Sequence, residues 1–202
     1  MNQGWLWTSS VPAGANQPDF NDAAFEPVTL PHSNVFVPWH NTDQTSFQFV
    51  SIYRRHFTLP AQLQGRRVFV DFEGVMTASK VFLNGQSIGE YEGGFTPSSF
   101  ELPRQIQWNR ENVLSVEVES HELPEVPPFG YEIDYLTYGG IYREVSLRIT
   151  APTYIENIQV RCIGVLTAQP SVEVDVFLDS AEPPAQAPAR KPSPRKSTAD
   201  LI

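Results

Sequence analysis

The sequence lacks most of the features that mark membrane, disulfide-stabilised or secreted proteins. Its 202 residues include one cysteine, Cys162, so no disulfide can form within the chain. Cys162 lies in the apolar run IQVRCIGV, where we expect a buried, unreactive thiol. No apolar stretch approaches the roughly 20 residues of a membrane-spanning helix, and the opening MNQGWLWTSS has no secretory-signal pattern. These absences predict a soluble, cytoplasmic chain with no membrane partner.

Positive charge is scarce and unevenly placed. The net charge is −9, from 14 Lys and Arg against 23 Asp and Glu. Residues 181–202 hold four of the basic and two of the acidic residues, which leaves 10 basic and 21 acidic residues, a net of −11, in residues 1–180. An acidic surface repels phosphate backbones, so we expect no nucleic-acid partner.

Motifs for nucleotide, metal and acyl-transfer chemistry are also missing. The glycine pairs Gly93-Gly94 and Gly139-Gly140 lack the spacing of a phosphate-binding loop, and no GxSxG sequence is present. The four histidines are scattered, so structural or surface roles are expected for them rather than a metal site. Carboxylates are abundant, but most lie on strand faces predicted to be solvated.

The sequence does contain repeated strand patterns. Apolar and polar residues alternate in RVFVDFEGV, NVLSVEVES and GIYREVSLRI, which is typical of strands with one buried face. Asn84-Gly85 lies between two apolar stretches and predicts a tight hairpin. With 18 prolines, 12 glycines and no long helical pattern, these signals predict an all-β antiparallel sandwich or barrel, with residues 1–46 wrapping its edge.

Three regions are expected along the chain. Residues 1–150 contain the main set of strands. Residues 151–180 add two alternating strands, YIENIQVRCIGV and SVEVDVFLDS, which cannot bury a core alone and would open a second sandwich. Residues 181–202 are rich in Pro, Ala, Ser and basic residues, a composition typical of a disordered tail.

A resemblance follows from the order of these motifs. LNG in a hairpin, then GGFTPSSFEL, NVLSVEVES and DYLTYGGIYREVSL resemble the N-terminal sugar-binding domain of glycoside hydrolase family 2, from about residue 25 to 150. The resemblance implies a jelly roll followed by the first strands of an immunoglobulin-like sandwich. It also implies a β-galactosidase, β-glucuronidase or β-mannosidase type of parent enzyme, which acts on terminal β-glycosides with retention.

The resemblance places both catalytic glutamates in a (β/α)₈ barrel after the immunoglobulin-like domain. This sequence ends before any barrel, and its basic ending suggests a truncated product. We therefore expect no catalytic residue here, and a non-catalytic fragment that supplies substrate-site walls and interdomain contacts. We expect no cofactor in the fragment, although a sodium ion would fit the whole enzyme, which could also be a homo-oligomer.

The loop before GGIYREV carries the candidate site residues. The resemblance implies that Asp134 contacts the substrate's galactosyl 6-hydroxyl and the sodium ion, as the matching aspartate does in some β-galactosidases. The alternative is an acid that caps a turn. Tyr131 and Tyr135 could offer apolar ring faces to sugar C–H groups, or pack beneath the loop together with Tyr138.

Three further residues have expected structural roles. Arg143 falls between Ile141 and Val145, on the predicted apolar face of a strand. A buried guanidinium needs a carboxylate partner, so Arg143 is expected to anchor the loop rather than to contact ligand. Gly139 and Gly140 are expected to permit the sharp reversal from loop to strand.

A function of another class remains open. A free-standing carbohydrate-binding module would need a groove within residues 1–150, with Trp39, Tyr131 and Tyr135 exposed around it. A scaffolding domain would bind no sugar. The sequence does not identify the sugar.

Overall fold

The computed structural model describes residues 1–34, 48–103, 106–127 and 139–181. Within them the chain is almost entirely β-structure, with one short 3₁₀ helix at Ala61–Leu63. It divides into two compact units, Met1–Thr150 and Ala151–Ile202, which are described separately.

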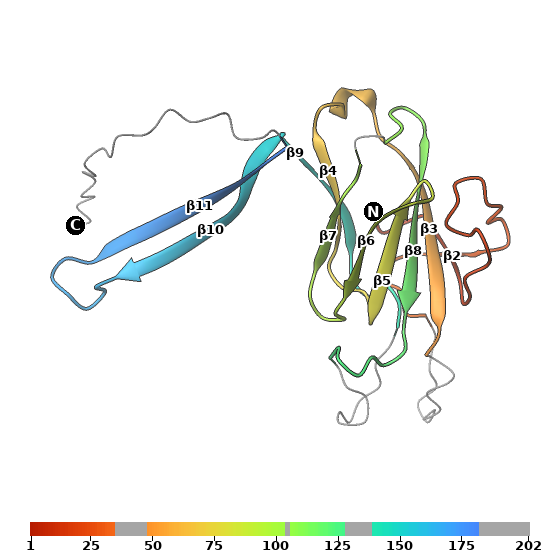
Figure 1. The fold of residues 1–202 in the computed structure, drawn as a ribbon, viewed down its shortest axis with the longest axis horizontal. Coiled ribbons are helices and arrows are strands. Elements are labelled where there is room, and N and C mark those ends of the chain that lie inside the picture. The colour runs from red at the N-terminus through yellow and green to blue at the C-terminus, as the bar shows by residue number, and fades with distance from the viewer. Residues whose placement is uncertain (35–47, 104–105, 128–138, 182–202) are drawn as a thin grey trace. The chain divides into compact units, whose positions relative to one another are not determined.

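The first unit is a sandwich of two antiparallel sheets (Figure 1). The larger sheet has six strands, in the spatial order β2 (Glu26–Val28), β1 (Trp5–Thr8), β3 (Val50–Thr58), β8 (Glu111–Glu119), β5 (Ala78–Leu83) and β6 (Gln86–Glu92). The smaller has three, in the order β7 (Ser98–Glu101), β4 (Arg67–Phe72) and β9 (Val145–Thr150). The predicted all-β, jelly-roll-type class is confirmed.

Alternation explains the core between these sheets. Val70 and Phe72 point inward from β4, and Leu114 and Val116 point inward from β8; all are 1% exposed or less. Burial of four such side chains contributes roughly 1.5–3 kcal/mol each, before the cost of ordering the chain is subtracted. The apolar faces predicted for these two strands are therefore confirmed.

The hairpin between β5 and β6 turns at Asn84 and Gly85. Both residues have positive φ, 50° and 83°, the backbone conformation of a type I′ turn. Adding a Cβ at Gly85 would also bring it within 2.5 Å of the Gln17 side chain. The Asn-Gly pair thus suits the turn, and the Gln17 side chain would have to move if residue 85 carried a Cβ.

The N-terminal region does more than wrap the edge. Its strand β1 pairs with β3, and β2 pairs with β1, so residues 5–28 extend the larger sheet at one side. The terminal amine of Met1 donates a hydrogen bond to the carbonyl of Val145, 2.6 Å away, which ties this region to the smaller sheet.

The second unit is a hairpin of β10 (Thr153–Ile163) and β11 (Ser171–Ser180). The register shifts between Ile155 and Asn157, so Glu156 is a one-residue β-bulge. Cross-strand partners share a face, which gathers eight apolar residues on one side: Ile155, Ile158, Val160, Cys162, Val172, Val174, Val176 and Leu178. This set is named the hairpin's apolar face.

The hairpin's apolar face is exposed rather than buried. Its aliphatic members are between 50% and 63% exposed. Cys162 is exposed too, so the prediction of a buried thiol was wrong. The alternation placed Cys162 on an apolar face correctly, but two strands alone cannot cover such a face. The immunoglobulin-like assignment of these strands stays a prediction.

Candidate functional site

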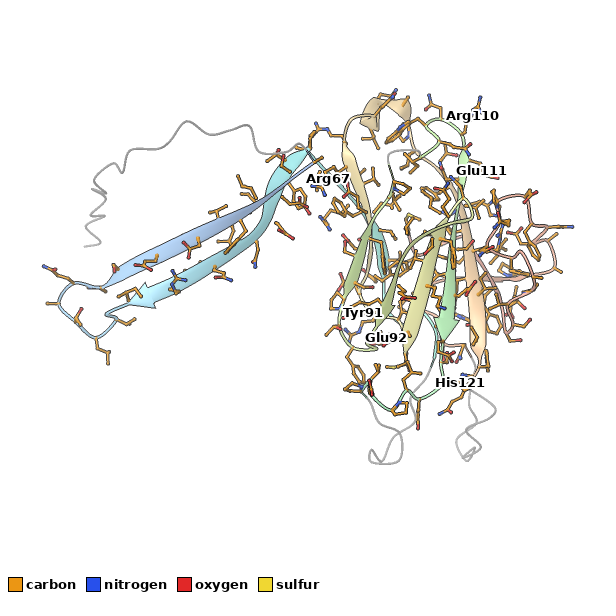
Figure 2. The ribbon with its side chains drawn as sticks, viewed as in Figure 1. Arg67, Tyr91, Glu92, Arg110, Glu111 and His121 are labelled. Carbon is orange, nitrogen blue, oxygen red and sulfur yellow. The ribbon has the colours of Figure 1, made fainter. Side chains whose placement is uncertain are left out.

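The predicted site residues Asp134, Tyr131 and Tyr135 lie outside the described residues, as does Trp39. The structure does describe the residues from which their segment departs. Gly139 and Gly140 follow it directly, and a Cβ on Gly139 would meet Ser120, the residue before His121, which Figure 2 labels at one end of the sandwich. Arg67, Arg110 and Glu111 mark the opposite end. We name the contacts around Gly139 and Gly140 the loop root.

Backbone hydrogen bonds fix the loop root from two sides. Gly140 and Met76 exchange two of them, at 3.0 and 3.2 Å. On the other side the amide of Asn34 donates to the carbonyl of Gly139 and the amide of His32 donates to that of Ile141, both at 2.9 Å. Residues 139–141 are thus held between two other parts of the chain.

Close packing explains why both loop-root positions are glycines. A Cβ on Gly139 would overlap the side chains of Ser120 and Asn34. Gly140 has φ +114°, a conformation unfavourable for other residues, and a Cβ there would lie 2.6 Å from the His32 carbonyl oxygen. The glycines therefore allow close approach of the backbone at both positions, and the reversal expected from loop to strand stays a prediction.

A buried polar contact joins the loop root to a second segment. Asn34 Nδ2 donates to Ser120 Oγ at 2.9 Å, and the two residues are 3% and 1% exposed. Ser120 follows β8, while Asn34 is the last described residue before segment 35–47. Segments 35–47 and 128–138 therefore depart from one shared, hydrogen-bonded base.

An aromatic cluster supports this base from inside. Tyr53 is fully buried, and its hydroxyl lies 2.9 Å from His32 Nδ1. Burial raises the pKa of Tyr53, despite a hydrogen bond with the Ile141 backbone. Burial also lowers the pKa of His32, an effect that the charge of Glu26 opposes. The pair is therefore neutral near pH 7, and its hydrogen bond positions the two rings without adding charge.

The structure corrects the expectation for Arg143. The strand that was predicted to include this residue begins only at Val145, and Arg143 is exposed. Its Nη1 lies 3.4 Å from the carbonyl oxygens of both Glu73 and Phe95. The burial prediction was wrong because Ile141 and Val145 belong to different local structures, so the alternation does not run through Arg143.

Among the described residues, the buried arginine is Arg54. It is 0% exposed, and its Nε donates to Asp22 Oδ2 at 2.7 Å. Its Nη1 also donates to the carbonyls of Ala15 and Gln17. The segment around residues 15–22 thereby covers the outer face of β3. Alternation places Arg54 on that face, but nothing in the local pattern indicates the covering segment.

Asp22 accepts a second contact, from His56. His56 Nε2 lies 2.8 Å from Asp22 Oδ2, and its Nδ1 lies 3.2 Å from Glu111 Oε1. Burial alone would raise the pKa of Asp22. Hydrogen bonds with His56 and Arg54, together with their charges, outweigh burial and leave this pKa below its ordinary value. Asp22 is therefore held as a carboxylate at neutral pH.

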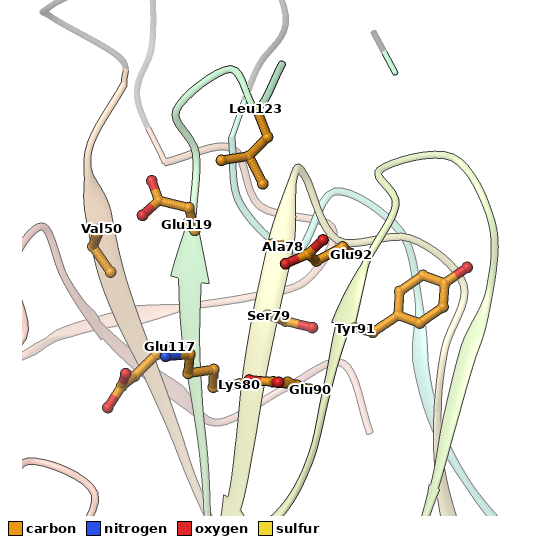
Figure 3. Close-up of a pocket in the computed structure, with 10 residues that line it drawn as sticks. All are labelled: Val50, Ala78, Ser79, Lys80, Glu90, Tyr91, Glu92, Glu117, Glu119 and Leu123. Carbon is orange, nitrogen blue, oxygen red and sulfur yellow. The ribbon is translucent and has the colours of Figure 1, made fainter. Parts of the chain in front are cut away.

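A concavity of about 370 Å³ lies over the larger sheet (Figure 3). Lys80 lies between the cross-strand partners Glu117 and Glu90, and Glu92 and Glu119 also line the space. Burial raises the pKa of Glu117, while Lys80 lowers it. Hydroxyl or cationic groups would suit these carboxylates. Tyr91 is turned away from the charges, and its hydroxyl lies 2.5 Å from Thr96 Oγ1.

The described residues hold neither a metal-binding cluster nor a membrane-spanning helix. They contain no group of three or more His, Cys, Asp or Glu side chains arranged to hold a metal ion. The position assigned to sodium, Asp134, lies outside these residues. In the same described part of the chain, no helix has the length and apolar character needed to cross a membrane.

Comparisons with known proteins extend these observations. Residues 36–127 match the family described as the glycosyl hydrolase 2 galactose-binding domain-like family. A β-galactosidase of Thermoanaerobacter pseudethanolicus is 40% identical over 159 residues, which cover 78% of this chain and 21% of the relative. A β-galactosidase of Thermoanaerobacterium thermosulfurigenes is 37% identical over 181 residues, 89% of this chain and 25% of the relative.

Solved structures agree with this result. A β-glucuronidase from glycoside hydrolase family 2 superposes with a TM-score of 0.76 at 25% identity, over 90% of this chain and 21% of that protein. The chain thus spans about a fifth to a quarter of the length of these relatives. The order of motifs, the jelly-roll sandwich and these matches agree: the chain contains the galactose-binding-like N-terminal domain of glycoside hydrolase family 2.

Proposed function

We propose that this chain is the non-catalytic N-terminal part of a β-galactosidase-type glycoside hydrolase, and that its segment 128–138 forms one wall of the substrate site. The observation that carries the proposal is the 40% identity to a β-galactosidase over 159 residues. In the whole enzyme, a terminal β-galactoside would bind at a catalytic barrel, with Asp134 accepting a hydrogen bond from a sugar hydroxyl.

The loop root supports this role. A substrate-positioning side chain must be held within a fraction of an ångström, and such side chains work best when they depart from rigid elements. Four backbone hydrogen bonds and two tightly packed glycines fix the point from which segment 128–138 departs. Tyr131 and Tyr135 lie in the same segment, and each could offer a ring face to the sugar.

The chain alone should not hydrolyse glycosides. The 202-residue chain is assayed with nitrophenyl β-galactoside and β-glucuronide, and no turnover above the buffer rate is expected. Turnover that co-purifies with the chain, and disappears when one of its own carboxylates is substituted, would contradict the proposal.

A chimera tests the role of Asp134 directly. Residues 1–150 of this chain replace the aligned segment of the Thermoanaerobacter pseudethanolicus β-galactosidase. Asp134→Ala should then lower kcat/KM for nitrophenyl β-galactoside at least about tenfold, equivalent to about 1.4 kcal/mol of transition-state stabilisation. Glu125→Ala, at an exposed acid nearby, is the matched control. Equal activities of the two variants would remove Asp134 from the substrate site.

The isolated chain also distinguishes the proposed role from the alternative of a free-standing carbohydrate-binding module. Calorimetric titration of the isolated chain with galactose and lactose should give no binding in the millimolar range if the site needs the barrel. Binding that is lost in both Tyr131→Ala and Tyr135→Ala would favour the module.

A further inference from the structure

An exposed arginine lies next to the loop root without a carboxylate partner among the described residues. Arg143 stacks on the ring of Tyr142, with 5.2 Å between the guanidinium carbon and the ring centre. Phe95 lies beside it, because Arg143 Nη1 contacts the Phe95 carbonyl, and Phe95 is 43% exposed. We name Phe95, Tyr142 and Arg143 the Arg143 platform.

The Arg143 platform is held rigidly. The Tyr142 hydroxyl donates to the carbonyl of Gly94 at 2.5 Å. A Cβ on Gly74 would lie 2.9 Å from the Tyr142 ring and 3.0 Å from Arg143 Cδ, so the backbone of residue 74 packs directly under both side chains. A side chain that is already fixed loses little conformational freedom on binding, which favours its use in an interface.

Several other arginines among the described residues have carboxylate partners, although Arg55, Arg66 and Arg110 have none in the same part of the chain. Arg67 lies 2.7 Å from Glu101, and Arg148 lies 2.8 Å from Asp71. Arg161 lies 2.9 Å from Asp175. Arg143 instead contacts two backbone carbonyls at 3.4 Å, which leaves most of its five N–H donors available. The platform therefore presents a cation stacked on one aromatic ring, that of Tyr142, and next to the exposed residue Phe95.

We propose that the Arg143 platform is a docking surface for another domain of the same polypeptide, one that presents a carboxylate beside an apolar side chain. Arginine, tyrosine and phenylalanine are enriched in such contacts, and a planar guanidinium pairs with a carboxylate through two hydrogen bonds. The docked domain is the catalytic domain, so this inference rests on the proposed function.

The position of the platform favours this occupant over an unrelated protein. Arg143 lies three residues after Gly140, whose amide and carbonyl are bonded to Met76. The Met76 side chain lies directly against Gly94, because a Cβ on Gly94 would overlap it. Gly94 immediately precedes Phe95. The platform and the loop root are thus parts of one packed unit. A domain that receives segment 128–138 in its active site must lie close to the platform as well.

The test compares one substitution in two settings. Arg143→Ala is made in the 202-residue chain and in the chimera described above, and thermal unfolding of each protein is followed. The exposed side chain should leave the midpoint of the isolated chain within about 1 °C of the original. In the chimera the midpoint of the transplanted segment should fall by about 4 °C or more, as expected for a central interface residue. Phe95→Ala should behave in the same way.

Matched controls separate docking from local folding. Arg66→Ala removes another exposed arginine and should change neither midpoint. Arg143→Lys keeps the charge but not the planar fork, and should recover only part of the loss in the chimera. Equal effects of Arg143→Ala in the two settings would overturn the proposal. So would an unaltered chimera whose transplanted segment unfolds independently, with the midpoint of the isolated chain.

The outcome is independent of the substrate role of Asp134. If Asp134→Ala leaves kcat/KM of the chimera unchanged while Arg143→Ala still lowers its midpoint, the docking surface stands and the proposed substrate wall fails. If Asp134→Ala lowers kcat/KM of the chimera while Arg143→Ala leaves its midpoint unchanged, the proposed docking surface fails and the proposed substrate wall stands.

Discussion

Arg54 and Asp22 form an ion pair of 2.7 Å in which the arginine has no exposed surface. The pair joins the outer face of β3 to the segment around residues 15–22. Because the guanidinium also donates to two backbone carbonyls of that segment, its charge and several of its donors are satisfied by a single covering stretch of chain. This network pins that stretch to the larger sheet.

Removal of the carboxylate should therefore be costly. Asp22→Asn leaves a buried guanidinium without its counterion and should lower the free energy of unfolding by about 3–5 kcal/mol. The measurement is urea denaturation of the 202-residue chain. Asp19→Asn, at an exposed position of the same segment, should change the value by less than about 0.5 kcal/mol. Similar losses in the two variants would show that the pair contributes little.

Asp22 also predicts how stability depends on acid. Its pKa is below the ordinary value in the folded state, so the unfolded state binds the proton more readily. The contribution is fully present above the unfolded pKa, about 3.9, and is lost as the pH falls through the lower folded value. The stability difference between the original chain and Asp22→Asn should thus be present at pH 5 and shrink below about pH 4. A difference that grows as the pH falls below 4 would contradict this assignment.

His32 should act in a higher pH range. Burial lowers its pKa, so the unfolded state binds more protons just below the ordinary value of about 6.5. Stability from the neutral imidazole is present above that value and is lost as the pH falls towards the folded pKa. His32→Gln removes this titration and should flatten the unfolding free energy between pH 7.5 and 5.5, relative to the original chain. His121→Gln, at an exposed site, serves as the comparison.

Gly140 should tolerate no side chain. Gly140→Ala combines an unfavourable φ with a Cβ 2.6 Å from the His32 carbonyl, and should cost more than about 2 kcal/mol. Gly65 has φ +86° with no atom near its Cβ position, so Gly65→Ala measures the backbone strain alone. We expect that control to cost about 1 kcal/mol. Urea melts of the two variants separate crowding from strain, and equal losses would remove the argument from packing.

The hairpin's apolar face should make the isolated chain self-associate. Val174→Lys places a charge in the centre of that face, and Gln159→Lys places the same charge on the opposite face. Only the first should reduce the concentration dependence of the apparent mass in sedimentation and the fluorescence of a bound apolar dye. Equal reductions would indicate that net charge, rather than the apolar surface, controls association.

Local signals predicted most of the fold. Asn84-Gly85 needs only its own backbone preferences to form a turn, and the apolar residues of β4 and β8 need only a partner sheet. Arg54 and Arg143 could not be assigned in this way. Alternation gives the side of a sheet on which a residue lies, but burial depends on whether a distant segment covers that side. Residues 15–22 cover Arg54, and the described structure provides no such cover for Arg143.

The candidate site was less predictable for a related reason. Its sequence motif indicates the segment that carries Asp134, whereas its base is assembled from three distant places in the chain. Asn34 and Ser120 are 86 residues apart, and neither belongs to a recognisable pattern. Their contact follows only from the fold, as does the crowding that requires Gly139.

The bulge at Glu156 has a consequence for how such strands are recognised. Before it, the apolar residue Ile155 occupies an odd position; after it, Ile158, Val160 and Cys162 occupy even positions. The two halves of β10 are therefore out of phase in the sequence, and a periodicity averaged over the strand partly cancels. In the folded hairpin the single extra residue places the apolar residues of both halves on the same face. The strand therefore has one apolar and one polar face, although its sequence shows only a weak two-residue periodicity. Deletion of Glu156 would strengthen that signal, because Ile155 and Ile158 would then be two positions apart and would share a face in a regular ladder without a bulge.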